Sequence, residues 1–485
     1  MPPKRSRSDD APQTKRPRLV REPQAAERKS TVLVNGRAGP RASAKRSKLA
    51  INDIPTLSEQ KLTVFNFGSG TICELGHGPD VTEIKRPRIN PFLPADDSCG
   101  IVSVAAGGSH VVAIDYQGHL WSWGQNDSAV LGRNTVETEE EKAEDHDLNG
   151  RESTPKRVEG IPDNVVFVAV AATDNLSAAI SEDGRVWAWG TFIDDGDKCF
   201  RAGGPDIQRQ PLPVPGIRGA VAMAGGKDHL LILDNKGDVH AWGIGLSGQL
   251  GHQVSTRLRT KTFGPLKVVG LKNIRAVAAG EYHSFAIDHN DRLYAWGLNN
   301  FGQCCIPDMA GEGKTITKPT LVSFFEDKPV KMVAGGNHHS LVLLKSGEVY
   351  AVGETNFHQL GLPKSSFPKS TVYEGDGTTA SYVPDPTKLT IGADGDDEDV
   401  TLPKFKYIAA GSDHSLALSE EDGSAWTWGF GEVYQLGHGK PAGEDSPEDE
   451  ELPRRIRNTA TTGVTMVYAG AGGQFSVLAG LPKEN

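Results

Sequence analysis

The stretch AAGEYHSFAIDHNDRLYAWGLNNFGQ (Ala278–Gln303) decides the fold, because the chain repeats it with few changes. Apolar and polar residues alternate in HSFAI and in RLYAW, which is the pattern of two short strands with one buried face. The residues between the two segments predict a tight turn. The stretch therefore predicts an antiparallel pair of strands that opens with a histidine and closes with Trp-Gly.

Six complete copies of this unit follow one another along the chain. The distance from the histidine position to the residue before the closing glycine is 13 in five copies and 14 in the sixth. Most turns end in glycine, as at Gln117-Gly118 and Ser346-Gly347, because glycine accepts the positive φ of a two-residue hairpin turn. Repeats of about fifty residues indicate a solenoid, an array or a propeller.

The two ends of the repeat region complete one another. The last copy begins at MVYAGAGGQFSVLAG (Met466–Gly480) and stops after its second strand, whereas LTVFNFGSGTICELGHG (Leu62–Gly78) has the missing half. A ring whose last blade is shared by residues 62–78 and 466–480 would leave no open sheet edge. We therefore predict an all-β fold, a seven-bladed β-propeller closed by its N-terminal strand.

Charge divides the chain into a basic tail and an acidic body. Residues 1–50 have fourteen Lys or Arg against four Asp or Glu, a balance of +10 in a chain of net charge −10. Little apolar content predicts that this tail is disordered and that residues 51–485 form the propeller. Most of the acidic excess lies in three predicted insertions, at residues 137–147, 394–399 and 444–451.

Two clusters in the tail, Lys4-Arg5 and Lys15-Arg16 with Arg18, have the spacing of a two-part nuclear import signal. They predict an import receptor as a partner and a nuclear location. Unstructured cations also bind DNA phosphates through counterion release. Composition leaves open whether the tail serves import alone or import and DNA together.

Other compositional features exclude several classes of protein. The longest apolar run, Val165–Ala172, is too short to span a bilayer, so no membrane association is expected. The five cysteines contain no C-x-x-C pair, which excludes a zinc pattern and a disulfide framework. A soluble protein in a reducing compartment is expected, with a monomer favoured.

Histidine recurs at one position of five repeats, and all eight tryptophans lie on the third strand of a repeat. Five histidines could suggest a metal ring, but equivalent positions of different blades are too far apart for one ion. We predict structural roles for the histidines, packing between blades for the tryptophans, and neither a metal nor a cofactor.

Two loops depart from the repeat. TFIDDGDKCFRAGGP (Thr191–Pro205) lacks the usual Gly-Gln-Leu-Gly turn and reads as an extra hairpin, and VSTRLRTKTFG (Val254–Gly264) is a basic finger. Irregular loops on a repeat scaffold often have functions, although a tolerated insertion and plain solvated surface are the alternatives.

With these features the chain resembles the regulator of chromosome condensation family, the guanine nucleotide exchange factors for the small GTPase Ran, in a fungal-like form. The resemblance covers about residues 62–480. It implies a β-wedge at about residues 191–203 that, with one propeller face, opens the nucleotide site of a Ran-like GTPase. Such a factor catalyses nucleotide release without covalent chemistry.

The resemblance also assigns residues and partners. It implies GTPase contacts at Asp174, Asp228, His338, His339, Phe192, Ile193, Asp194, Asp195, Lys198 and Phe200. It implies nucleosome contacts, to the acidic patch of the histone dimer and to DNA, at Arg257, Arg259, Lys261, Lys4, Arg5, Lys15, Arg16 and Arg18. The family expects a further histidine where this chain has Phe475. The alternative is a scaffold propeller for another signalling or ubiquitin-ligase partner.

Overall fold

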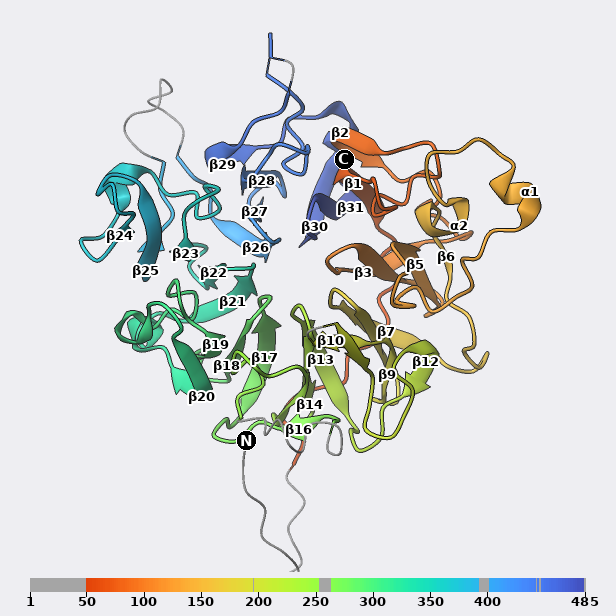
Figure 1. The fold of residues 1–485 in the computed structure, drawn as a ribbon, viewed down its shortest axis with the longest axis horizontal. Helices are drawn as coiled ribbons and strands as arrows, with labels where there is room; N and C mark the ends of the chain where they lie inside the picture. The colour runs from red at the N-terminus through yellow and green to blue at the C-terminus, as the bar shows by residue number, and fades with distance from the viewer. Residues whose placement is uncertain are drawn as a thin grey trace, which may run out of the picture. The chain divides into compact units, whose positions relative to one another are not determined.

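The computed structural model describes residues 49–483 apart from 195, 253–262, 392–400, 442 and 445. The chain divides into two compact units, residues 1–47 and 48–485, and the first lies outside the described residues. Within the described part of the second unit, seven sheets of four or five strands are arranged around a central axis (Figure 1). The predicted seven-bladed propeller is confirmed.

In blades 1 to 4 and in blade 6, the first strand lies at the axis and the last strand lies at the rim. Blade 1 consists of β3 (Ile101–Ala106), β4 (His110–Asp115), β5 (Leu120–Gly124) and β6 (Lys156–Arg157). Blade 2 consists of β7 (Phe167–Ala172), β8 (Leu176–Ser181), β9 (Val186–Gly190) and β12 (Gln208–Pro213). Blade 3 consists of β13 (Ala220–Gly225), β14 (His229–Asp234), β15 (Val239–Gly243) and β16 (Leu266–Lys267).

The next three blades repeat this order. Blade 4 consists of β17 (Ile274–Ala279), β18 (His283–Asp288), β19 (Leu293–Leu298) and β20 (Thr315–Leu321). Blade 5 has five strands, β21 (Val330–Gly335), β22 (His339–Leu344), β23 (Val349–Glu354), β25 (Ala380–Lys388) and, outermost, β24 (Val372–Tyr373). Blade 6 consists of β26 (Phe405–Ala410), β27 (His414–Ser419), β28 (Ala425–Gly429) and β29 (Glu450–Arg455).

Blade 7 joins the two ends of the propeller. Its inner strands are β30 (Val464–Ala471) and β31 (Phe475–Pro482), and its outer strands are β1 (Thr63–Ser69) and β2 (Glu83–Ile89). Strands β1 and β31 are antiparallel, with a register that runs from Thr63 opposite Gly480 to Gly68 opposite Phe475. The predicted closure by the N-terminal strand is therefore confirmed.

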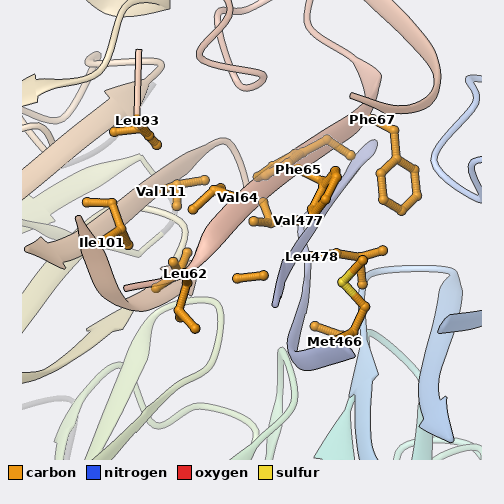
Figure 2. Close-up of a cluster of buried hydrophobic side chains, with 14 of the residues drawn as sticks. Leu62, Val64, Phe65, Phe67, Leu93, Ile101, Val111, Met466, Val477 and Leu478 are labelled. Atoms are coloured by element: carbon orange, nitrogen blue, oxygen red, sulfur yellow. The ribbon is translucent and has the colours of Figure 1, made fainter. Parts of the chain in front are cut away.

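The shared blade has a continuous apolar core (Figure 2). Phe65 and Phe67 from β1 meet Val477 and Leu478 from β31, and all four side chains are fully buried. Such burial stabilises by roughly 1.5–3 kcal/mol for each large side chain. Closure of the ring thus depends on apolar contacts as well as on strand pairing.

The second strand of every complete blade is buried along its whole length, as in β18, where all six residues of HSFAID are buried. Neighbouring blades cover both faces of this strand, which explains its apolar composition. The indole N–H groups of Trp123, Trp189 and Trp296 donate to loop carbonyls of the preceding blade at 2.6–3.1 Å. Tryptophan therefore packs blade against blade.

Residues 51–62 form a strap outside the sheets. The N–H groups of Ile51 and Asn52 donate to the carbonyl of Asn235, in the turn between β14 and β15, and the N–H of Leu62 donates to Ile101. Leu57 packs against the cores of blades 1 to 3. The strap thus contacts the turn between the second and third strands of blade 3 and ends beside β3 of blade 1.

The helices are short and lie in the connections. They are α1 (Glu139–Lys142), α2 (Gly150–Ser153) and the 3-10 helices η1 (Pro307–Met309), η2 (Ser323–Phe325), η3 (Lys364–Ser366) and η4 (Thr459–Thr461). Within the predicted acidic insertion 137–147, α1 begins with a capping box between Thr138 and Glu141. The insertion 394–399 lies outside the described residues. No helix in the described residues is long and apolar enough to cross a bilayer.

Candidate functional site

The loops between the first and second strands of the blades meet around the axis. The position of the repeat histidine is occupied by Leu176 in blade 2 and by Phe475 in blade 7. The residues two positions before it form the channel ring: Gly108, Asp174, Lys227, Glu281, Asn337, Ser412 and Gly473. The residues one position before it form the face ring: Ser109, Asn175, Asp228, Tyr282, His338, Asp413 and Gln474. The position before a buried repeat residue thus defines one face of the propeller.

Backbone hydrogen bonds connect the channel ring from blade to blade. The N–H of Asp174 donates to the carbonyl of Lys227, the N–H of Lys227 to Glu281, and the N–H of Glu281 to Gly336. Further bonds run from Asn337 to Ser412 and from Gly473 to Gly108. Because these bonds hold the backbone of the loops in place, the positions of the channel-ring side chains are fixed relative to one another.

A small cavity of about 130 Å³ lies at the channel mouth. Among the described residues, three charged side chains and one serine line it. They are Asp174, Lys227, Glu281 and Ser412, and most other lining residues are glycines. Glu281 is held from two sides, because the Ser412 hydroxyl donates to its Oε1 at 2.8 Å and Lys227 Nζ lies 3.5 Å from its Oε2. The Lys227 ammonium also lies over the Tyr282 ring, 5.5 Å from its centroid.

Asp174 lies in this mouth without a side-chain hydrogen bond from any described residue. Burial and the nearby Glu281 carboxylate raise the pKa of Asp174 to about 7, while Lys227 opposes that rise. Burial and Glu281 likewise raise the pKa of Asp413 to about 6. Among the described lining residues, two carboxyl groups thus share one lysine, and the mutual repulsion of the acidic groups favours their protonated forms.

The irregular loop of blade 2 forms a hairpin of β10 (Phe192–Asp194) and β11 (Asp197–Cys199). Its base is apolar, because the rings of Phe192 and Phe200 pack on Trp242 of blade 3 at 5.1 and 5.2 Å between centroids. Both phenylalanine side chains are fully buried. Gly196 and Asp197 are exposed at the outer turn, and Asp195 lies outside the described residues.

A polar contact fixes the same hairpin from the channel side. The N–H of Ile193 donates to Oδ1 of Asp228 at 2.9 Å. Burial raises the pKa of Asp228, and this hydrogen bond together with Lys227 opposes the rise. Asp228 thus connects the hairpin to the channel mouth.

The two predicted histidine contacts differ in their surroundings. His338 is partly exposed on the face ring and lies between Tyr282 and Phe301, with ring centroids 6.1 and 4.9 Å away. His339 is fully buried, and its Nε2 lies 3.0 Å from the Ser415 hydroxyl of blade 6. Of the pair, only His338 has a surface that a partner could reach.

The repeat histidines form a set of joints between blades that the sequence analysis did not identify. Each Nε2 lies 2.7–3.0 Å from a serine hydroxyl in the next blade, and that serine donates to a loop carbonyl. The pairs are His110–Ser177, His229–Ser284, His283–Ser340, His339–Ser415 and His414–Ser476. Burial lowers the pKa of these imidazoles, to about 3 for His110, so they are neutral.

The pairing of each histidine with a serine of the next blade also explains the two blades that have Leu176 and Phe475 at the histidine position. Where the histidine is absent, the serine of the next blade is absent too, so that Leu176 shares a core with Leu230 and Phe475 shares one with Val111. A signal was present in the sequence, since each His matches a Ser one repeat later. In the last blade the exposed face position belongs to Gln474, and Phe475 is fully buried.

Of the two other predicted hairpin contacts, Asp194 is buried and Lys198 is partly exposed opposite Ile193. The predicted nucleosome contacts fall outside the described residues. Arg257, Arg259 and Lys261 lie in the segment 253–262, and the tail cations precede residue 49. The end of the basic finger is described, because Phe263 packs on Phe192 at 5.7 Å and its carbonyl accepts from the N–H of Ala202. The finger therefore rejoins the ring next to the hairpin. Among the described residues, no group of three or more His, Cys, Asp or Glu could hold a metal ion.

Comparison with known proteins places this geometry in a family. The model of the RCC1-like domain matches residues 63–478, which is most of the chain. The chain belongs to the RCC1-like domain family. Among its members, the guanine nucleotide exchange factor SRM1 of Saccharomyces cerevisiae is 40% identical over 483 residues, covering 93% of this chain and 96% of that protein. The human regulator of chromosome condensation is 29% identical, covering 92% of this chain and 99% of its own.

Solved RCC1-like structures agree with the fold. A crystal structure of Prp20p from S. cerevisiae, described together with its binding properties to Gsp1p and histones, has a TM-score of 0.79 at 40% identity and covers 89% of this chain and 94% of that one. A structure of Kap60 bound to yeast RCC1 (Prp20) has a TM-score of 0.80 at 39% identity, with coverages of 93% and 97%.

Proposed function

We propose that this chain is a guanine nucleotide exchange factor for a Ran-like small GTPase, and that it acts in the nucleus from chromatin. The observation that carries the assignment is the braced hairpin beside an acidic channel mouth, in a chain 40% identical over nearly its whole length to an exchange factor. The hairpin replaces the repeat turn at a single blade, which is where a scaffold acquires a function.

The mechanism is displacement without bond making. In a GTPase, the phosphate loop and Mg²⁺ hold the nucleotide phosphates. A hairpin pressed against that loop disturbs those contacts, so the factor and GDP weaken each other's binding by the same factor. The nucleotide concentrations outside the complex then decide which nucleotide enters.

The residues have distinct roles in this proposal. Phe192, Phe200 and Trp242 anchor the hairpin, and Asp228 braces it. Ile193 and Lys198, which are partly exposed, belong with Asp195 to the part that approaches the GTPase, whereas the buried Asp194 acts through its place in the hairpin. Asp174 and His338 contact the partner from the propeller face, whereas buried His339 acts only through its position.

The partners extend this function to chromatin. The yeast relative binds histones and Gsp1p, and a second structure of it contains Kap60. In this chain, Arg257, Arg259 and Lys261 would meet the histone acidic patch. The tail residues Lys4, Arg5, Lys15, Arg16 and Arg18 would meet DNA phosphates or the import receptor.

The test is release of fluorescent GDP from a purified Ran-like GTPase, with a Ras-like and a Rho-like GTPase as comparisons. We expect a catalytic amount of the protein to accelerate release from the Ran-like GTPase by several orders of magnitude. Equal, unaccelerated release from all three would refute the assignment.

A further inference from the structure

A second cavity lies between blades 6 and 7, and neither the hairpin nor the channel mouth contributes to its lining. We propose that this cavity binds a small molecule with several phosphate groups close together, such as an inositol polyphosphate or a nucleoside triphosphate. The ligand would bind apart from the GTPase, so the site goes beyond the proposed function and does not depend on it.

The cavity lies at the other end of the strands from the channel ring. Its lining includes Asp422 and Gly423 in the turn between β27 and β28, whereas the channel ring lies in the loops between first and second strands. A strand of six residues, such as β27, is roughly 17–20 Å long. A ligand in the cavity would therefore leave the face ring free for a GTPase.

Blades 6 and 7 both supply basic side chains to the lining. Arg455 ends β29 and Arg457 follows it, while Arg86 lies in β2 and Lys483 follows β31. Since β2 and β31 belong to the two halves of the shared blade, the cavity lies against the blade that closes the ring. A ligand bound to all four cations would connect blade 6 to both halves of blade 7.

The size of the cavity suits a small molecule. Its volume is about 730 Å³, within the range of roughly 300–1,000 Å³ that is usual for small-molecule sites. Part of the lining is apolar, because it includes the buried residues Ile456 and Met466. Gly463 leaves the backbone open on one side, since a Cβ added there would meet no atom within 4 Å.

The lining has an excess of positive charge. Among the described residues it has four basic side chains and one carboxylate, a net charge of +3. Arg455 already pairs with that carboxylate, because its Nη2 lies 2.6 Å from Oδ2 of Asp422. No described residue forms an ion pair with Arg86, Arg457 or Lys483. Bound phosphate groups would neutralise these three cations and supply acceptors for their N–H groups.

The amount of charge favours more than one phosphate group. A phosphate monoester carries only about −1.5 to −2 at neutral pH, so one such group leaves the net charge of +3 unbalanced. The planar guanidinium of arginine matches two phosphate oxygens at once, and two of the three unpaired cations are arginines. The hydroxyl groups of Ser424 and Thr459 also lie in the lining and provide further donors.

A DNA duplex fits the cavity less well than a compact ligand does. Exposed Glu420 and Glu421 precede Asp422 in the turn that lines the cavity. A duplex carries one negative charge for about every 1.7 Å of its axis, so a duplex that reached the cavity would also meet these carboxylates. A small polyphosphate would stay within the cavity and avoid them.

Titration calorimetry with the full-length protein at physiological salt concentration tests the site. The ligands are inositol hexakisphosphate, GTP and orthophosphate. We expect micromolar binding of at least one of the first two, and binding of orthophosphate that is weaker by at least about 100-fold. Tighter binding of GTP would identify the natural ligand as a nucleotide, and tighter binding of inositol hexakisphosphate would identify an inositol polyphosphate.

Two variants and a matched control locate the binding. Arg457→Gln and Lys483→Gln each remove one unpaired cation, and we expect each to weaken binding by about tenfold. The control Lys236→Gln removes an exposed cation from the turn between β14 and β15 of blade 3, and it should bind as wild type does. All of these proteins keep the basic tail, so equal affinities would show that the tail binds the ligand and would overturn the site.

Two further measurements decide the proposal. Because the ligand joins blades 6 and 7, about 100 times its Kd should raise the thermal midpoint of the wild type by roughly 3–5 °C, and that of the two cavity variants by less. An equal rise in all variants would contradict the cavity. If a short DNA duplex loses as much affinity as the polyphosphate does in both variants, the cavity is a DNA contact and the proposal is wrong.

Discussion

The carboxylate of Asp228 accepts a hydrogen bond from the backbone N–H of Ile193, which ties the hairpin of blade 2 to a loop of blade 3. This contact makes Asp228 a positioning residue. The loop that carries it also carries Lys227 of the channel mouth, so one short segment connects the two parts of the candidate site.

Removal of this brace should slow exchange without unfolding the ring. We expect Asp228→Ala to lower kcat/KM for GDP release by at least about tenfold, and Asp228→Asn to lower it less, because an amide oxygen can still accept from Ile193. Fluorescent-GDP release measures the rates, and circular dichroism checks the fold. Wild-type kinetics for Asp228→Ala would contradict the role.

The apolar base of the hairpin makes a separate prediction. Phe200→Ala removes a fully buried ring from Trp242, a truncation that costs roughly 3–5 kcal/mol when it affects a whole core. Because the loss falls on a two-stranded hairpin, we expect faster amide exchange across residues 192–200 and slower GDP release. Hydrogen exchange followed by mass spectrometry locates the effect. Protection lost evenly over all blades would argue against a local anchor.

The histidine–serine joints should behave as pairs. His229→Leu leaves the buried Ser284 without its donor and should lower the free energy of unfolding by roughly 1–3 kcal/mol. The double variant His229→Leu/Ser284→Leu copies the natural Leu176–Leu230 pair, and we expect it to recover at least half of the loss. Chemical denaturation measures both. A double variant as unstable as the sum of its singles would disprove the coupling.

The same histidines should make the ring sensitive to acid. Burial lowers their pKa, so between about pH 3 and pH 6.5 the unfolded chain binds more protons than the folded one. The free energy of unfolding must therefore fall as pH falls below about 6.5, by up to about 1.4 kcal/mol per pH unit for each histidine. Denaturation midpoints from pH 7 to pH 5 test this. The double variant above should show a shallower dependence than wild type.

Asp174 should have the opposite effect on how the free energy of unfolding depends on pH. Its pKa is raised to about 7, so the folded state holds a proton that the unfolded state releases, and ionisation between about pH 4 and pH 7 disfavours folding. We expect Asp174→Asn to stabilise the protein at pH 8 by roughly 1 kcal/mol while impairing exchange. Wild-type kcat/KM should rise between about pH 6 and pH 8, and the Asp174→Asn profile should be flatter. Parallel profiles would show that another group titrates.

Two truncations separate the tail from the ring. Removal of residues 1–48 leaves the strap contacts of Ile51 and Asn52 intact, so we expect unchanged exchange and weaker, less salt-dependent binding to DNA and nucleosomes. Removal of residues 1–70 deletes β1 and should abolish folding. Filter binding and thermal denaturation measure the two effects. Unaltered DNA affinity after the shorter truncation would exclude the tail as the DNA contact.

Periodicity accounts for how far the sequence could predict the fold. The regular spacing of the repeats predicts each blade, and the two half repeats, Leu62–Gly78 and Met466–Gly480, predict the closure of the ring. Both predictions depend only on local strand and turn patterns. The outer strands were less predictable. Strand β24 is two residues long, and the strap at 51–62 has no repeat to match.

The candidate site was predictable as residue positions but not as contacts. Asp174 and Asp228 stand out as carboxylates beside a repeat position, yet their different roles depend on distances between blades that local patterns do not encode. Glu281 is the clearest case, since its hydrogen bond from Ser412 joins blade 4 to blade 6. His339 is a case in which the sequence alone does not show burial, because this repeated histidine is fully buried and has no surface for a partner.

Shared construction of blade 7 has a consequence for synthesis on the ribosome. Strand β1 leaves the ribosome more than 400 residues before its partner β31. Throughout that interval an apolar strand with unpaired backbone groups stays available for wrong pairing. Newborn chains should therefore depend on molecular chaperones until the last strand leaves the exit tunnel.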